Sequence, residues 1–267
     1  MGLHLPTDAR AFLGQNAISY SEISTLAACE WKWKALYDGP KHENTSSPAM
    51  DLGREMHRLL GLWWDPKDAA LDVFVTENPT AEWLIRRYDE YYMEDAAPLR
   101  MLDLEIPFAV KLPWGPYLFG YFDGLVYNHE TGQHWITEFK TMGNWSKLNQ
   151  LPVDKQITLY QYAATASGLP TVGVMYDAIR TYMWTGKNAD QHDPAESFER
   201  LFITRTEEQI QECLDELESA YSVQLDLRYN LRKPIRNVGT HCDWCACMPE
   251  CYGIGLTLEP EHGTLAF

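Results

Sequence analysis

The sequence predicts an α/β fold with a helical N-terminal region and a cysteine-bearing C-terminal lobe. Helical periodicity dominates before residue 95, strand-like alternation begins near Leu102, and helical and strand-like patterns then alternate. The 267 residues are 45% hydrophobic, which is enough for one substantial core. We expect a single domain over 1–267, divided into a helical region at 18–100, a strand-rich core at 101–205 and a C-terminal lobe at 206–267.

The N-terminal region is expected to form three helices. Residues 18–37 have apolar side chains at helical spacing, and Gly39 and Pro40 end that pattern. Residues 49–64 repeat the helical spacing, and residues 79–94 form a third, more acidic segment with the same period.

The middle of the chain changes to strand patterns. Three strand-like runs are expected at 103–112, 117–127 and 133–141, separated by turn sequences rich in Pro, Gly and Asn. A helix over 152–167 opens with Pro152 and stops at Gly168. Strands at 172–184 and 198–204, an acidic loop at 185–197 between them and a long amphipathic helix at 206–229 complete the pattern.

Composition limits the class of protein. Lys and Arg total 22 against 38 Asp and Glu, a formal charge of −16, which argues against a uniform nucleic-acid-binding surface but leaves room for a local basic groove. Arg228, Arg232, Lys233 and Arg236 form such a basic stretch without an acid. No apolar run is long enough for a membrane span, and the N-terminus has no secretory pattern. We expect a cytoplasmic protein that does not contact membranes.

Two carboxylates and a lysine fall on neighbouring predicted strands. Asp123 lies in one strand, and Glu138 and Lys140 project to the same face of the next, because side chains alternate along a strand. Carboxylates bind Mg²⁺ or Mn²⁺, and a nearby ammonium can offset charge on a phosphate. An E-x-K pair alone is more often a solvated charge pair than a catalytic one.

Three further residues strengthen the catalytic interpretation. His57 lies on the helix before the strands, and Gln156 and Tyr160 share one face of the helix after them. Imidazole would favour Mn²⁺. Each has a structural alternative: His57 as a surface residue, and Gln156 and Tyr160 as a half-buried pair.

The motifs G-x-x-x-H, G-x-x-D, E-x-K and Q-x-x-x-Y, in this order, resemble the RecB-like branch of the PD-(D/E)XK nuclease superfamily over residues 18–251. The resemblance implies a restriction-endonuclease-like mixed sheet flanked by helices. It implies that Mg²⁺ or Mn²⁺ is held by His57, Asp123, Glu138 and the backbone carbonyl of Phe139, that Lys140 is the catalytic lysine, and that Gln156 and Tyr160 orient DNA and the active site.

The cysteines allow two interpretations. Cys242, Cys245, Cys247 and Cys251 are close enough in sequence for a local zinc site, although their C-x-C element is unusual in zinc ribbons. Alternatively, Cys29 with Cys242, Cys245 and Cys251 resembles the 4Fe–4S staple of AddB-type nucleases and CRISPR-associated adaptation nucleases, which we favour. Glu30 follows Cys29 where that family often has proline. Cys213 is expected to be a small buried residue.

The resemblance therefore implies a metal-dependent DNA exonuclease, stapled by a 4Fe–4S cluster, in recombination, repair or phage DNA processing within a bacterial or phage-infected cell. One alternative is a CRISPR adaptation nuclease that trims spacer precursors, and another is a non-catalytic zinc-containing DNA-binding module. The expected partners are DNA ends or single strands, with a separate helicase, annealing or integrase protein. Trp31, Trp33 and Trp244 are candidates for base stacking or for the core, and Lys32, Lys34 and Arg228–Arg236 for a basic rim.

Overall fold

The computed structural model describes residues 16–39, 47–64, 75–93, 98–182 and 193–253. Residues 185–192 of the predicted acidic loop lie outside these ranges. The described residues form two compact units, each assembled from two separate stretches of chain. The first contains those of Met1–Tyr20 and Ser46–Glu218, and the second those of Ser21–Thr45 and Ser219–Phe267. No helix among the described residues is long and apolar enough to cross a membrane.

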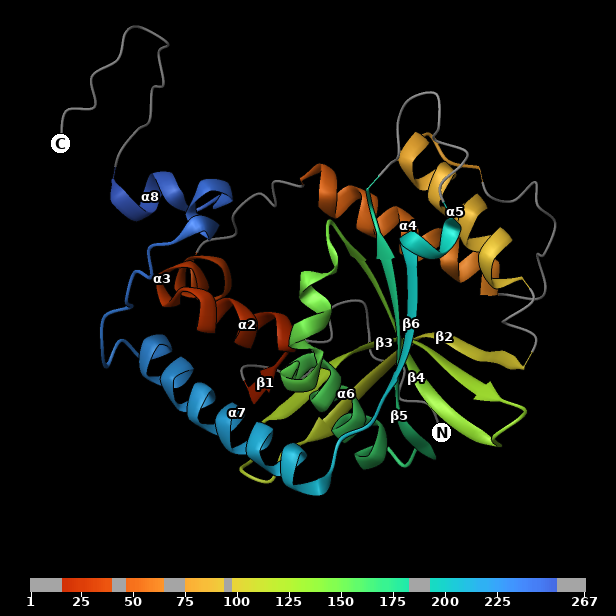
Figure 1. The fold of residues 1–267 in the computed structure, drawn as a ribbon. Helices are drawn as coiled ribbons and strands as arrows, with labels where there is room; N and C mark the ends of the chain where they lie inside the picture. Colours follow the sequence, from red (N-terminus) through yellow and green to blue (C-terminus); the bar gives the residue numbers. More distant parts are fainter. Residues whose placement is uncertain (1–15, 40–46, 65–74, 94–97, 183–192, 254–267) are drawn as a thin grey trace, which may run out of the picture. The chain divides into compact units, whose positions relative to one another are not determined.

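The first unit is built on a six-stranded mixed sheet (Figure 1). Its strands are β1 (Ala17–Ile18), β2 (Leu99–Lys111), β3 (Tyr117–Asn128), β4 (Gln133–Met142), β5 (Thr171–Arg180) and β6 (Phe198–Ile203). The order is β1-β3-β4-β5-β6, with β2 also paired to β3. The run β2-β3-β4 is antiparallel, whereas the parallel pairs β1–β3 and β4–β5 give the sheet its mixed character.

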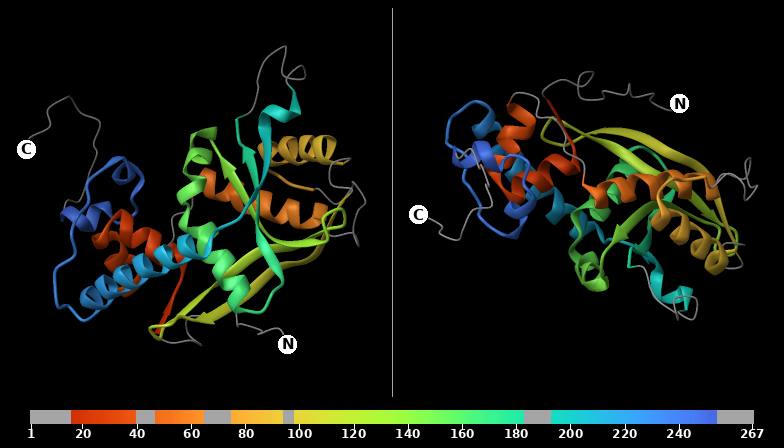
Figure 2. Two further views of the ribbon diagram at one scale, coloured as in Figure 1. Left: turned by 60° about the horizontal axis from the view of Figure 1, so that its bottom comes forward. Right: turned by 90° about the horizontal axis from the view of Figure 1, so that it is seen from above.

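Helices cover both faces of this sheet (Figures 1 and 2). The helical segments of this unit are α4 (Pro48–Trp64), α5 (Pro79–Tyr92), α6 (Lys155–Ala166), the 3₁₀ turns η4 (Trp145–Val153) and η6 (Pro194–Ser197), and α7 (Glu207–Arg228) as far as Glu218. Apolar side chains of α4 and α5 pack with Phe139 and Met175 of the sheet to form the main core. The opposite face of the sheet carries α6.

The start of α6 differs from the sequence prediction. Pro152 lies inside η4, and the helix begins at Lys155, after Asp154. The Asp154 side chain accepts a hydrogen bond from the backbone N–H of Ile157 at 3.1 Å and so caps the helix. Expecting the helix to open with Pro152 is wrong because a capping carboxylate, rather than the proline, sets the first turn. This start fixes where Gln156 projects.

The second unit is helical. It contains α2 (Tyr20–Ala28) apart from Tyr20, α3 (Glu30–Trp33), the π-helical turn η2 (Lys34–Asp38), the end of α7, the 3₁₀ turn η7 (Thr240–Trp244) and α8 (Met248–Tyr252). Leu26, Trp33 and Leu227 form its buried cluster. The single helix expected over 18–37 is wrong, because Cys29 has an extended backbone, with φ −165° and ψ 114°, and separates α2 from α3.

Candidate active site

The two candidate carboxylates meet on neighbouring strands. Gly124 of β3 pairs with Thr137 of β4, so the next position along, Asp123, lies beside Glu138. The Oδ2 atom of Asp123 accepts a hydrogen bond from the backbone N–H of Phe139 at 2.7 Å. Glu138 is 3% exposed. The β3–β4 hairpin therefore brings the two carboxylates close together, with Glu138 on the face of the sheet that α6 covers.

Helix α6 completes this arrangement from the same face. The Lys140 ammonium donates to Glu138 Oε1 at 2.8 Å and to Gln156 Oε1 at 2.9 Å. The Gln156 amide in turn donates to Glu138 Oε1 at 2.9 Å and to the Tyr160 hydroxyl at 3.1 Å. Gln156 and Tyr160 can act together because residues four apart share one face of a helix. The E-x-K strand and the Q-x-x-x-Y helix thus form one hydrogen-bonded group.

His57 approaches the carboxylates from α4. Its Nδ1 atom lies 3.6 Å from Asp123 Oδ1, and its imidazole interacts with the backbone of Phe139. The ring also contacts the edge of the Phe139 ring, with centroids 6.0 Å apart. The structure therefore brings together every residue that the sequence nominated for the metal site and its catalytic lysine.

Burial dominates the electrostatics of this group. It raises the pKa of Asp123 to about 6 and, together with the negative charge of Asp123, raises the pKa of Glu138 to about 7. Burial opposes the charge on Lys140, but the negative charge of Glu138 outweighs it and raises the lysine pKa. Burial lowers the pKa of His57, which favours the neutral imidazole. Because the pKa values of Asp123 and Glu138 are both raised, these two carboxyl groups would accept further positive charge nearby.

A comparison with known protein families shows which superfamily the chain belongs to. Residues 17–252 match the family model described as the PD-(D/E)XK nuclease superfamily. The chain belongs to that superfamily. The match spans both the carboxylate group on the sheet and the C-terminal cysteines, as the motif order predicts.

One solved structure agrees with this nuclease superfamily assignment at the level of the fold. A crystal structure described as "Putative exonuclease" from Eubacterium rectale is 18% identical, covers 93% of this chain and 94% of its own, and has a TM-score of 0.60. The crystal structure of SSO0001 is 10% identical, with coverage of 88% and 84% and a TM-score of 0.40. No curated protein matches the chain.

Nucleases of this superfamily imply a divalent cation, and the donor chemistry here suits one. Two carboxylates and a neutral imidazole are ligands that Mg²⁺ or Mn²⁺ accepts. Among the described residues, however, no group of three or more His, Cys, Asp or Glu side chains is arranged closely enough to enclose an ion. Glu138 is instead turned onto Lys140 and Gln156. The site therefore has suitable donors in an open arrangement.

Two supporting features of this candidate site were not found from the sequence. Tyr176 of β5 pairs with Glu138 and is 5% exposed, so it lies beside the carboxylate on the sheet. Arg205 binds Thr158 of α6 through Nε at 3.0 Å, and its backbone N–H binds Gln161 at 2.7 Å. These contacts fix the position of the first turns of α6. The sequence carries no local signal for Tyr176 or Arg205. Tyr176 reaches the site through the parallel β4–β5 pairing, and Arg205 lies far from α6 in the sequence.

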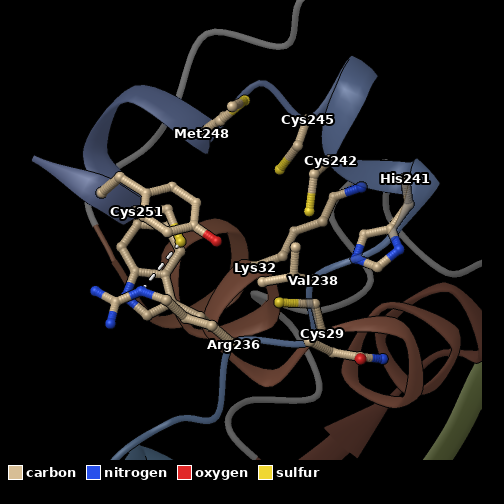
Figure 3. Close-up of a pocket in the computed structure, with 12 residues that line it drawn as sticks. Cys29, Lys32, Arg236, Val238, His241, Cys242, Cys245, Met248 and Cys251 are labelled. Carbon is tan, nitrogen blue, oxygen red and sulfur yellow. Dashed lines mark hydrogen bonds between the residues drawn. The ribbon is translucent and has the colours of Figure 1, made fainter. Parts of the chain in front are cut away.

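Four cysteines line one cavity of the second unit (Figure 3). They are Cys29, Cys242, Cys245 and Cys251, and their sulfur atoms point into the space between them. Arg236 donates through Nε to the sulfur of Cys251 at 3.2 Å, and its guanidinium lies 5.8 Å from the Trp31 ring centroid.

The remaining two cysteines do not line this cavity. Cys247 is fully buried outside the lining of the cavity, and burial, together with the charge of Cys245, raises the pKa of its thiol to about 11. Cys213 belongs to the first unit and is 8% exposed, which agrees with a small buried side chain.

The expected basic rim is only partly available. Arg228 forms an ion pair with Asp38 at 3.8 Å, and Arg232 forms one with Glu30 at 2.6 Å, so acids from outside this stretch engage two of its bases. Those acids come from α3 and η2, far away in sequence, which is why the local pattern did not reveal them. Lys34 also pairs with Asp38. Trp33 is fully buried in the core, and the Trp244 side chain lies outside the described part of the chain.

Proposed function

We propose that the protein is a metal-dependent DNA exonuclease that hydrolyses phosphodiester bonds. The observation that carries the proposal is the hydrogen-bonded group of Glu138, Lys140 and Gln156 beside Asp123 and His57, because these residues come from the four motifs that resemble those of a nuclease superfamily. The name of the similar Eubacterium rectale protein supports action on DNA ends.

In this proposal the divalent cation is held by His57, Asp123, Glu138 and the backbone carbonyl of Phe139. When bound, Mg²⁺ or Mn²⁺ supplies positive charge for the scissile phosphate. The raised carboxyl pKa values of Asp123 and Glu138 support this assignment, because two buried acids without a cation hold protons that a cation would displace.

Lys140 would orient the attacking water and offset the charge that develops on the phosphate. Its side chain is 41% exposed, so the ammonium is reachable from solvent while two hydrogen bonds hold it in place. Gln156 binds both Lys140 and Glu138, and we assign it the role of keeping their separation fixed. Tyr160 would anchor Gln156 from the next turn of α6.

The test compares the wild type with Lys140→Met and with Lys111→Met, a matched variant at an exposed lysine at the end of β2. Linear DNA labelled at either end and a closed circular DNA are digested with Mn²⁺ or Mg²⁺. We expect digestion from the ends, no cleavage of the circle, and a loss of roughly 100- to 1,000-fold in Lys140→Met alone. Undiminished digestion by Lys140→Met contradicts the site, and cleavage of the circle contradicts the exonuclease assignment.

We also propose that the cavity of the second unit holds a 4Fe–4S cluster bound by Cys29, Cys242, Cys245 and Cys251. Support comes from the four thiols that line one cavity and from the positive charge of Arg236 beside Cys251. Thiolates are the ligands of such clusters. The local zinc interpretation needs Cys247, which does not line this cavity. The cluster would hold α3 and the C-terminal segment together and would take no part in hydrolysis.

The finer functional assignments are part of the same proposal. We place the enzyme in DNA recombination, repair or phage DNA processing, and unwinding would come from a separate helicase. Single-stranded DNA could stack on Trp31, which lines the thiol cavity beside Lys32 and Arg236.

A further inference from the structure

Glu30 links the two stretches of chain that make up the second unit. One oxygen of its carboxylate accepts a hydrogen bond from Arg232 Nη2 at 2.6 Å, and the other accepts one from the backbone N–H of Ile235 at 2.9 Å. Ile235 lies 205 positions further along the chain than Glu30. Both oxygens of one carboxylate therefore bind the same short segment of the second stretch.

Two further hydrogen bonds beside this carboxylate extend the connection. The backbone N–H of Trp31 donates to the carbonyl oxygen of Ile235 at 3.2 Å. The side-chain amide of Asn237 donates to the carbonyl oxygen of Ala28 at 2.9 Å. Together with the two bonds of the carboxylate, they form what we call the Glu30 clasp. Every partner in the clasp is a group of the protein itself, so the clasp closes through amino-acid contacts alone.

The clasp surrounds Cys29, which lies at the break between α2 and α3. Because the backbone of Cys29 is extended, helical geometry alone does not fix the direction of its thiol. The clasp binds the chain on both sides of it, at Ala28 and at Trp31. On the other stretch, Asn237 lies only five positions before Cys242. The hydrogen bonds of the clasp therefore hold the chain next to cysteines on both stretches.

The same contacts border the thiol cavity. Trp31 and Asn237, which both take part in the clasp, line that cavity together with the four cysteines. The thiol of Cys29 lies 4.0 Å from the carbonyl oxygen of Ile235, the residue whose N–H binds Glu30. The four sulfur atoms point into the space between them (Figure 3). The clasp and the cavity thus share one wall.

We propose that Glu30 is a positioning residue of the thiol site, which brings Cys29 to Cys242, Cys245 and Cys251 before any metal binds. The second unit therefore keeps its fold when the metal is removed, and the preformed site takes the metal up again. Renewed uptake rests on the proposed 4Fe–4S cluster, whereas the positioning of the thiols does not. A cluster would add a second connection between stretches that the clasp already joins.

The test cross-links the thiols of the full-length protein after a chelator has removed its metal. Dibromobimane becomes fluorescent only when it has linked two thiols, and mass spectrometry of the peptides identifies the pair. We expect the wild type to link Cys29 to a cysteine within 242–251. Glu30→Ala should link Cys29 roughly tenfold more slowly, because hydrogen bonds to a charged group are lost. Glu30→Gln keeps an oxygen for the N–H of Ile235 but loses the charge, and its rate should lie between the two.

The matched control is Asp38→Asn. Asp38 also joins the two stretches of the second unit, through its ion pair with Arg228 at 3.8 Å, but it does not line the thiol cavity. This variant should link Cys29 at the wild-type rate even where its Tm is lower. Circular dichroism checks that each protein is folded at the assay temperature. Equal slowing in Asp38→Asn and Glu30→Ala would show general destabilisation, which overturns the positioning role.

A second measurement separates this inference from the proposed cluster. Iron and sulfide are added back without oxygen, and the bound iron is counted. We expect the wild type to regain its iron and Glu30→Ala to regain less. Cross-linking at the wild-type rate in both Glu30 variants overturns the clasp, whatever the iron content. A wild-type protein that links Cys29 faster than Glu30→Ala but takes up no iron supports the clasp and overturns the cluster.

Discussion

Gln156 touches Glu138 and Lys140 with opposite ends of one amide: its NH₂ donates to the carboxylate at 2.9 Å, and its oxygen accepts from the ammonium at 2.9 Å. The neutral Gln156 side chain thus bridges an ion pair in which Lys140 Nζ lies 2.8 Å from Glu138 Oε1. The bridge needs both a donor and an acceptor, so hydrophobic or charged replacements cannot reproduce it.

The first prediction concerns this bridge. Gln156→Ala should lower kcat roughly 10- to 100-fold with little change in KM, because Lys140 loses a partner that fixes its position. Gln211→Ala, which removes an exposed glutamine paired with Asp215 on α7, is the control and should leave both constants unchanged. Steady-state digestion of end-labelled DNA measures both. A rise in KM alone would indicate that Gln156 binds substrate instead.

The second prediction concerns pH. The pKa of Glu138 is raised from 4.5 to about 7, so the folded, metal-free protein holds this proton more tightly than the unfolded chain. Its contribution to stability is therefore present at low pH and is lost as pH rises through that interval. The Tm of the metal-free wild type should fall relative to that of Glu138→Gln between pH 5 and pH 8, measured by thermal melting with a chelator. A constant difference between the two proteins would contradict the raised pKa.

The third prediction concerns a buried ion pair behind the site. Arg200 binds Asp177 at 2.8 Å and the Tyr88 hydroxyl at 2.7 Å, and Asp177 is fully buried. Arg200→Met leaves that carboxylate without its cation and should cost about 3–5 kcal/mol in the free energy of unfolding. Urea denaturation measures it.

The control for that experiment is Arg86→Met. Arg86 pairs with Glu82 on the exposed side of α5, and both side chains are well solvated. Losing this pair should cost no more than about 0.5 kcal/mol. Equal losses in the two variants would mean that burial does not distinguish the pairs.

The fourth prediction concerns the thiol cavity. After purification without oxygen, Cys29→Ser should lose iron, because Cys29 lines the cavity, whereas Cys213→Ser should keep it. Cys247→Ala should also keep its iron, since Cys247 lies outside the lining. Iron and sulfide content, with absorption spectra, measure this. If Cys247→Ala loses metal while Cys29→Ser retains it, the metal is bound by the four cysteines between 242 and 251, and the assignment of Cys29 as a cluster ligand is wrong.

Local patterns predicted most of this fold. The strands at Asp123 and Glu138 alternate clearly, and α6 has the period of a helix, so those elements appear within a few residues of their expected bounds. Helical periodicity failed at Cys29, because backbone conformation at one residue leaves the surrounding apolar pattern intact. The two-residue strand β1 is too short for any periodicity.

The site residues that belong to sequence motifs were predicted, whereas those brought to the site by long-range strand pairing were not. His57, Asp123 and Lys140 stand in recognisable spacings. Tyr176 reaches the site only through strand register, which depends on how β5 aligns with β4. Single-sequence patterns carry no information on that alignment.

The second unit has a consequence for how the protein is made. Its core joins Leu26 and Trp33 to Leu227, so the early part of that core leaves the ribosome long before its partner. At roughly 5–20 residues per second, synthesis of the intervening chain takes on the order of 10–40 s. During that interval the indole of Trp33, fully buried in the finished protein, has no native partner from α7. The apolar side chains of α2 and α3 in the nascent chain therefore stay without this native partner until α7 has been synthesised.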